Sequence, residues 1–221
     1  MSLIVDLKRR AIVLGAAATL AAPFLNVHAH GAFTGVDGSV EPSGFWERPR
    51  WVWLKRAASG EVIKIVYWQN GQLIDDAYRQ LSWFLRDLRF ESMLKRRDPA
   101  ISFALNRGII SEAHLSPWVL MDPVLLDILY AYCAWLHVYG VESPILMTSA
   151  FRHLITNNMT EGSARNSEHV KGGAGDIVVP GVSPIALAKF GKWLSGGGVG
   201  LYTNRGFIHV DRGRVRSWSG R

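Results

Sequence analysis

Patterns of apolar residues divide the chain into an early strand-rich part, a helical middle and a late strand-rich part. β-branched and aromatic residues dominate positions 51–56 and 61–68, which favours two strands joined by a short turn. Residues 75–89 instead carry apolar side chains at helical spacing, which predicts a helix. Residues 90–120 show no clear period, and no element is assigned to them.

An almost wholly apolar segment, residues 124–139, predicts the central helix of the core. Asp122 and Pro123 precede it as N-cap and first-turn proline, and Gly140 ends it. One further helix is predicted at 183–194, and short strands are predicted at 144–149, 176–179, 199–202 and 207–211. This order favours an α+β fold with a mainly antiparallel sheet.

Residues 1–29 have the layout of an export signal. Lys8-Arg9-Arg10 forms a charged start, an apolar run follows, and Val27-His28-Ala29 offers a small-residue cleavage site. The paired arginines resemble a twin-arginine signal; a general secretory signal or an uncleaved anchor are the alternatives. Because the run is shorter than the about 20 residues of a membrane span, no stable span is expected after cleavage. Residues 30–45 are predicted to form a linker, and residues 46–221 one domain.

The composition is that of a folded, mildly basic protein. Hydrophobic residues make up 48% and charged residues 19%, which argues against disorder, and the net charge is 25 − 18 = +7. This charge suits an anionic partner such as a cell-wall polymer, whereas the lack of a long Lys/Arg run argues against nucleic acid. The single cysteine, Cys133, excludes an intrachain disulfide and is expected to be a buried thiol rather than a nucleophile. The pattern predicts no particular oligomeric state.

The stretch from 167 to 176, Ser-Glu-His-Val-Lys-Gly-Gly-Ala-Gly-Asp, carries the strongest chemical signal. It holds His169 and Asp176, with glycines between them that allow the backbone to approach a ligand. Downstream, period 2 along the last predicted strand puts His209 and Asp211 on one face and apolar residues on the other. Two imidazoles and one carboxylate with room for a water fit an open, catalytic zinc site.

The same ligand types also bind non-haem iron. In the iron oxygenases a His-x-Asp pair comes first and a distal histidine follows, whereas His209-x-Asp211 comes last in this chain. This order favours zinc over iron. Of the other histidines, His137 is expected to be a packed or rim residue, and His114 and His153 show no partner pattern.

The signature Ser167-x-His169-x-x-Gly172-x-Ala174-x-Asp176 resembles that of the M15-type zinc peptidases, which cut bacterial peptidoglycan peptides. More narrowly, the chain resembles the YcbK-like branch of murein endopeptidases, and the resemblance covers nearly the whole mature chain. Flanking segments that fit this branch include Tyr67-Trp68-Gln69-Asn70-Gly71, Met121-Asp122-Pro123, Ser149-Ala150-Phe151-Arg152 and Phe207-Ile208-His209-Val210-Asp211.

The resemblance implies a hedgehog/D-Ala-D-Ala-peptidase-like fold, with zinc held by His169, Asp176 and His209. It also implies an exported, zinc-dependent murein endopeptidase of the periplasm or cell envelope, which hydrolyses amide bonds in peptidoglycan stem peptides or cross-links. Two alternatives remain. One is a D,D-carboxypeptidase or dipeptidase of the same superfamily, and the other is a non-catalytic zinc-containing module that binds the cell wall.

Arg152 matches the arginine of the family's strand-end motif. Since the tetrahedral oxyanion of amide hydrolysis needs a positive partner, Arg152 is assigned to the scissile carbonyl oxygen or to a substrate carboxylate. The alternative is a surface arginine that pairs with Glu161 or Glu168.

Asp211 is the candidate general base, or a residue that orients the zinc ligands. Better-known M15 enzymes carry an acid three residues before the last zinc histidine, a position that Gly206 occupies in this chain. Glu168 and Tyr202 are further candidates for the base. The alternative for Asp211 is a structural salt bridge with Arg212, Arg214 or Arg216.

Overall fold

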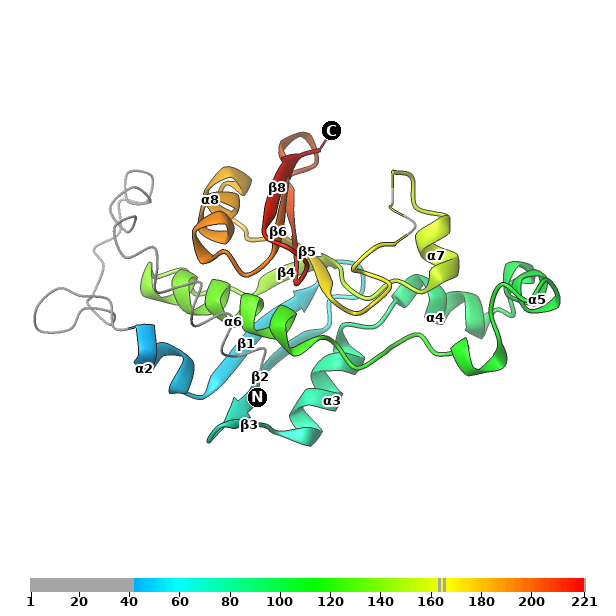
Figure 1. Ribbon diagram of the computed structural model, residues 1–221, viewed down its shortest axis with the longest axis horizontal. Coiled ribbons are helices and arrows are strands. Elements are labelled where there is room, and N and C mark those ends of the chain that lie inside the picture. Colours follow the sequence, from blue (N-terminus) through cyan, green and yellow to red (C-terminus); the bar gives the residue numbers. More distant parts are fainter. Residues whose placement is uncertain (1–41, 163, 165, 221) are drawn as a thin grey trace, which may run out of the picture.

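The computed structural model describes residues 42–162, 164 and 166–220 as an α+β fold built on one sheet (Figure 1). The expected leader, residues 1–29, and most of the expected linker lie outside the described residues. Helix α2 (Pro42–Glu47) spans the expected junction between linker and domain. Its Phe45 ring stacks on Tyr130 with ring centroids 4.8 Å apart, so this helix packs against the domain.

The sheet has eight strands in the order β3-β2-β1-β4-β5-β7-β6-β8. Their bounds are β1 (Arg50–Arg56), β2 (Val62–Gln69), β3 (Gln72–Leu73), β4 (Ile145–Ser149), β5 (Ala174–Val178), β6 (Gly198–Tyr202), β7 (Phe207–Asp211) and β8 (Arg216–Ser219). The pairs β1–β4 and β6–β8 are parallel and the others are antiparallel, so the expectation of a mainly antiparallel sheet is confirmed. Strand β8 had no counterpart among the predicted elements.

Some helices lie next to this sheet, and others lie at one end of the molecule (Figure 1). Besides α2, they are α3 (Asp75–Phe84), α4 (Leu88–Lys95), α5 (Pro99–Asn106), α6 (Pro123–Val138), α7 (Leu154–Asn158) and α8 (Pro184–Leu194), with 3₁₀ turns η3 (Glu112–His114) and η4 (Thr203–Arg205). Across the described part of the chain, no helix combines the length and the apolar character that crossing a membrane requires.

Helix α6 is the central helix that the apolar segment predicts. The Asp122 carboxylate accepts a hydrogen bond from the Val124 amide at 2.9 Å and caps the helix as expected. One charged residue of α6, Asp127, is buried, and it pairs with Arg50 of β1 at 2.7 Å. Tyr67 of β2 donates a hydrogen bond to the same carboxylate at 2.8 Å. This polar cluster joins α6 to two strands of the sheet.

The helix predicted over residues 75–89 is wrong in its last third, because α3 ends at Phe84. The buried Arg56 side chain donates to the carbonyl oxygens of Phe84 and Arg86, at 3.0 and 2.8 Å. Asp87 then accepts from the Phe90 amide at 3.0 Å and starts a new helix, α4. Arg56 thus binds carbonyl oxygens at the end of α3, and Asp87 caps the start of α4 directly afterwards. The single apolar pattern therefore forms two helices.

Helices α4, α5 and α7 gather at one end of the molecule (Figure 1). They bury a small apolar cluster of their own, separate from the main core, which contains Phe90, Met93, Ile101, Ala104, Ile110 and Ile155. The unassigned segment 90–120 therefore consists of short helices that bury their apolar side chains mainly against one another.

We expect the Arg50–Asp127 pair to dominate local stability, since its side chains are only 2% and 4% exposed. Burial already raises the pKa of Asp127, although Arg50 and Tyr67 counteract this shift. The substitution Arg50→Met leaves a buried carboxylate without its cation, which should lower the free energy of unfolding by about 3–5 kcal/mol in urea unfolding. As control, Lys95→Met removes an exposed ion pair and should change it by less than about 0.5 kcal/mol. Equal effects of the two substitutions would contradict this account.

Candidate metal centre

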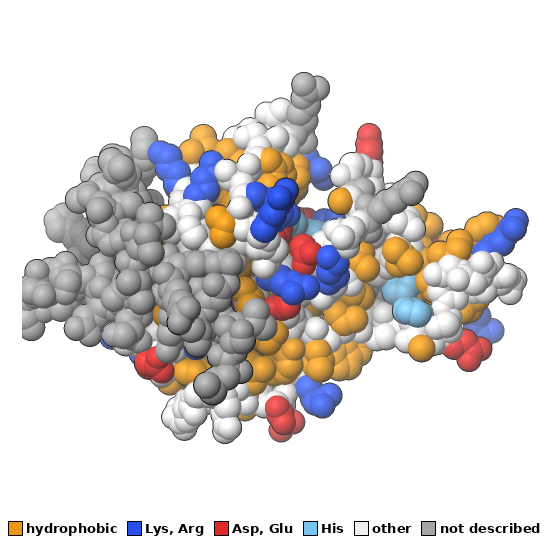
Figure 2. All heavy atoms as spheres, viewed as in Figure 1, with side chains coloured by type: hydrophobic (Ala, Val, Ile, Leu, Met, Phe, Trp, Pro, Cys, Tyr) orange, Lys and Arg blue, Asp and Glu red, His pale blue; other side chains and the backbone are white. Residues whose placement is uncertain are grey.

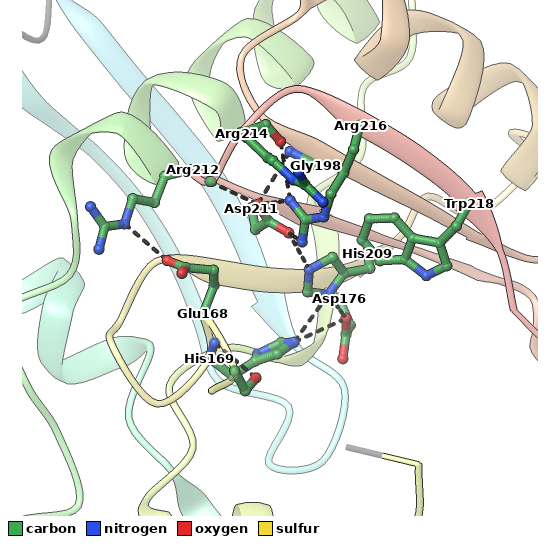
Figure 3. Close-up of polar contacts among 12 residues, drawn as sticks. Glu168, His169, Asp176, Gly198, His209, Asp211, Arg212, Arg214, Arg216 and Trp218 are labelled. Atoms are coloured by element: carbon green, nitrogen blue, oxygen red, sulfur yellow. Dashed lines mark hydrogen bonds and ion pairs between the residues drawn. The ribbon is translucent and has the colours of Figure 1, made fainter. Parts of the chain in front are cut away.

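The pairing of β5 with β7 places two of the expected metal ligands side by side. Asp176 of β5 lies opposite His209 of β7 in the antiparallel register. His169 comes from the turn before β5, where its carbonyl oxygen accepts a hydrogen bond from the Arg152 amide at 3.2 Å. Residues from two strands and one turn thus converge on one point (Figure 3).

The three ligand atoms have the spacing of one coordination shell. His209 Nδ1 lies 2.9 Å from Asp176 Oδ1, and His169 Nε2 lies 3.3 Å from the same oxygen and 3.2 Å from His209 Nδ1. Ligand atoms about 2.0–2.1 Å from a tetrahedral zinc ion lie about 3.3 Å apart, so these residues fit zinc. No other group of three or more His, Cys, Asp or Glu residues is arranged in this way among the residues that the structure describes.

The outer nitrogens of both histidines are held by acceptors, which determines where each ring carries its proton. His169 Nδ1 lies 2.6 Å from the Ala150 carbonyl oxygen, so Nδ1 donates and Nε2 is left with a lone pair. His209 Nε2 lies 2.9 Å from Asp211 Oδ2, which leaves Nδ1 as the ligand atom. Such outer-shell acceptors orient metal-binding imidazoles in proteins.

Burial and charge also set the protonation of the group. Burial lowers the pKa of His169, which favours the neutral imidazole that a metal requires. Burial raises the pKa of Asp176, but the imidazoles of His169 and His209 outweigh this and hold it well below its usual range. Burial lowers the pKa of His209, whereas its hydrogen bonds to the carboxylates of Asp176 and Asp211 raise it above its usual value overall.

Asp211 is fully buried behind the His209 ring. Its carboxylate accepts from Arg216 at 2.7 and 3.0 Å and from the amides of Gly198 and Gly213 at 3.2 and 2.8 Å. Burial raises the pKa of Asp211, but His209 and Arg216 hold it well below its usual range. The structure therefore contains both the contact to His209 and the expected salt bridge, with Arg216. Since Asp211 contacts the outer nitrogen, its geometry fits the orientation of His209 better than proton transfer.

Arg152 contacts the group at two residues, Asp176 and His169, and its Nη2 lies 3.3 Å from His169 Nε2. Its Nη2 donates to Asp176 Oδ2 at 2.6 Å and its Nε donates to Ser149 Oγ at 2.8 Å. Glu168, one of its expected alternative partners, instead pairs with Lys171 at 2.8 Å and with Arg212 at 3.0 Å. Arg152 therefore holds the second oxygen of Asp176 and leaves Oδ1 facing the two histidines.

The group lies in a cavity of about 1040 Å³. Ligand pockets are usually about 300–1,000 Å³, so this one has room for a peptide. Figure 2 shows Lys and Arg side chains around a hollow in the middle of this face, with histidine and acidic side chains inside it. Besides the metal group, the walls include Glu161, Glu168, Tyr202, Arg205, Phe207 and Trp218.

Comparison with known proteins finds similarity to peptidases. The family model described as Peptidase M15 matches residues 103–211. Over 175 residues the chain is 28% identical to the peptidoglycan L,D-endopeptidase MepK of Escherichia coli K12, which covers 77% of this chain and 81% of the relative. The chain is therefore similar to peptidases of the M15 family.

A second relative is similar to a shorter part of the chain. Over 102 residues the chain is 36% identical to a Haemophilus influenzae protein named "Probable peptidoglycan L,D-endopeptidase MepK", which covers 45% of this chain and 55% of the relative. No solved structure matches the chain at a significant level.

Some residues have other surroundings than the sequence suggests. Gly172 has φ of 69° and packs against Val119, where a Cβ atom would lie 2.9 Å from Cγ2, so packing against a neighbouring loop requires the glycine. Cys133 is buried as expected, and burial raises its pKa to about 12. Sequence analysis assigned no role to Trp218, whose ring lies 5.3 Å from that of His209. It lies on β8, which has no distinct apolar pattern.

We expect the protein to bind zinc through His169, Asp176 and His209. His169→Ala, Asp176→Ala and His209→Ala should each lose the metal, because two ligands do not replace the shell of a tetrahedral ion. Elemental analysis after dialysis measures the zinc. The control His137→Ala, at an exposed histidine outside the group, should keep it. Full zinc in the three ligand variants would refute the assignment.

We expect Asp211→Asn to weaken zinc binding by about 10- to 100-fold, since the variant orients His209 less firmly. Competition with a chromogenic chelator measures the affinity. Glu168→Gln is the matched control, because its carboxylate lines the same cavity but pairs with Arg212 and Lys171 instead of a histidine. The same affinity in both variants would show that Asp211 does not act through His209.

Proposed function

We propose that the chain is an exported, zinc-dependent endopeptidase that hydrolyses amide bonds in the stem peptides or cross-links of peptidoglycan. The observation that carries the proposal is the His169–Asp176–His209 group in an open cavity of a chain that is similar to M15 peptidases. Relatives named as peptidoglycan L,D-endopeptidases support the substrate class. A net charge of +7 suits an anionic polymer. A hedgehog/D-Ala-D-Ala-peptidase-like arrangement and export by the twin-arginine route to the periplasm or cell envelope belong to the same proposal.

The chain's own residues prepare the site. His169, Asp176 and His209 would hold the zinc, and Ala150 and Asp211 hold the two imidazoles in place. When bound, zinc supplies a Lewis acid and a water whose pKa is lowered from about 15.7 to about 7. Because Asp176 and His209 lie on paired strands, little reorganisation is needed when substrate arrives.

Arg152 provides positive charge beside the group. Its Nε and Nη2 are engaged by Ser149 and Asp176, and no partner of Nη1 is recorded within the described residues. We assign Nη1 to the carbonyl oxygen of the scissile amide, where a fixed donor stabilises the negative charge that develops on that oxygen. A substrate carboxylate is the other group that this donor can bind.

The proton acceptor has to face the cavity. Asp211 lies behind His209, and Tyr202 accepts a hydrogen bond at its hydroxyl from Trp218 Nε1 at 3.2 Å. Glu168 is a carboxylate on the cavity wall, directly before His169, and it pairs with Arg212 and Lys171. We therefore assign the general base to Glu168, and orientation of His209 to Asp211.

Two other functions remain as alternatives. A D,D-carboxypeptidase or dipeptidase would use the same zinc group on a shorter substrate. A non-catalytic zinc-containing module that binds the cell wall is favoured by one observation, the glycine at position 206 where better-known M15 enzymes carry an acid. Product analysis separates the three.

We expect the mature, zinc-loaded protein to release muropeptides from purified sacculi, and a chelator to stop the release. Glu168→Gln should lower turnover by about 100-fold or more while keeping the zinc, since it removes only the base. Liquid chromatography with mass detection identifies the products. Release of single terminal residues would point to a carboxypeptidase. Zinc and sacculus binding without any product would support the non-catalytic module.

A further inference from the structure

Two arginines of the cavity wall lie outside its ion pairs, and so does one acid of the wall, Glu161, within the described residues. Asp176 pairs with Arg152, Asp211 with Arg216, and Glu168 with Arg212 and Lys171. Two more arginines, Arg205 and Arg214, line the same cavity with exposed side chains. For neither of them is an ion pair with a carboxylate recorded in the part of the chain that the structure describes.

Arg205 is held at the cavity wall by an aromatic stack. It ends turn η4, and Gly206, with φ of 72°, leads the chain into β7. The guanidinium carbon of Arg205 lies 5.1 Å from the ring centroid of Phe207, and Phe207 stacks on Tyr202 at 4.6 Å and 13°. A stacked guanidinium uses its face and leaves its N–H edge free, the edge that binds a carboxylate with two hydrogen bonds.

This stack is close to the metal group along the strand. Phe207 and His209 are two residues apart on the same face of β7, about 7 Å between their Cα atoms. An extended peptide covers a similar distance in two residues. A peptide whose scissile amide lies at the metal group can therefore bring a carboxylate one or two residues away to Arg205.

We propose that Arg205 binds a carboxylate of the substrate one or two residues from the scissile amide, and thereby selects acidic peptides. The inference rests on the proposed function, because it needs a peptide in the same cavity. It also accounts for Gly206, the point where this chain departs from better-known M15 enzymes. An acid at that position would repel a substrate carboxylate, whereas a glycine next to Arg205 does not.

The test compares two forms of one substrate. Muropeptide dimers released from sacculi by a muramidase are used with free carboxylates and after conversion of these carboxylates to carboxamides. The zinc-loaded protein, Arg205→Gln, Arg205→Lys and Arg107→Gln are compared by kcat and KM and by equilibrium binding of each dimer. Arg107→Gln is the matched control, since Arg107 is also exposed and stacked on an aromatic ring, Phe103 at 5.5 Å, outside the cavity.

We expect Arg205→Gln to lower kcat/KM for the free-acid dimer by about 10- to 100-fold, mainly through KM, and to leave the amidated dimer unchanged. Arg205→Lys should recover part of the loss, because it keeps the charge but not the bidentate edge. Arg107→Gln should match the unmodified protein with both dimers.

Other outcomes overturn the proposal or separate it from the proposed function. If Arg205→Gln loses kcat/KM equally for both dimers, Arg205 only supports Phe207. If the unmodified protein cuts both dimers at the same rate, no carboxylate is selected. In these cases turnover remains and the endopeptidase stands. If neither dimer is cut but the free-acid dimer binds in an Arg205-dependent manner, the endopeptidase fails and the carboxylate site stands. Absence of both turnover and such binding overturns both.

Discussion

The site depends on one register, that between β5 and β7. Asp176 and His209 are 33 residues apart in the chain and become neighbours only because these strands pair as they do. A shift by one residue would turn His209 to the other face of the sheet. Such a shift is opposed by Ile208 and Val210, which are 0% and 1% exposed on the opposite face. The apolar core, rather than any polar contact, thus determines that a metal group can form.

The polar side chains at the site form one continuous row, in which carboxylates alternate with arginines and an imidazole. It runs from Arg216 through Asp211 and His209 to Asp176 (Figure 3), and Asp176 in turn contacts Arg152. A buried charge is tolerated when partners on each side neutralise it, which is why Asp211 can be fully buried and still ionised. Since an arginine already stands at each end of the row, a further cation is stabilised most in the middle.

Sequence reasoning predicted those parts of the molecule that depend on local periodicity. The period of 2 along residues 207–211 placed His209 and Asp211 on one face, and the apolar run predicted α6. It did not predict α4, α5 or β8. Phe90 and Ile155, for example, belong to one buried apolar cluster, although they lie far apart in the sequence. No local pattern contains such a contact. The two roles left open for Asp211 depend on which nitrogen of His209 it contacts, and only the structure contains that information.

The positions of Glu168 and Arg205 favour one orientation of a peptide bound in the cavity. With Asp211 behind His209, the base that we propose, Glu168, comes from the turn before β5, while Arg205 comes from the turn before β7. In an M15 enzyme with its acid three residues before the last histidine, negative charge would lie at the position of Gly206, next to Arg205. Exposed charges are screened beyond about 8 Å at physiological salt, so these local charges act on a bound peptide more strongly than the net charge of the whole chain does. A peptide with a carboxylate on one side of its scissile amide would therefore bind in one orientation, with that carboxylate at Arg205 and away from Glu168.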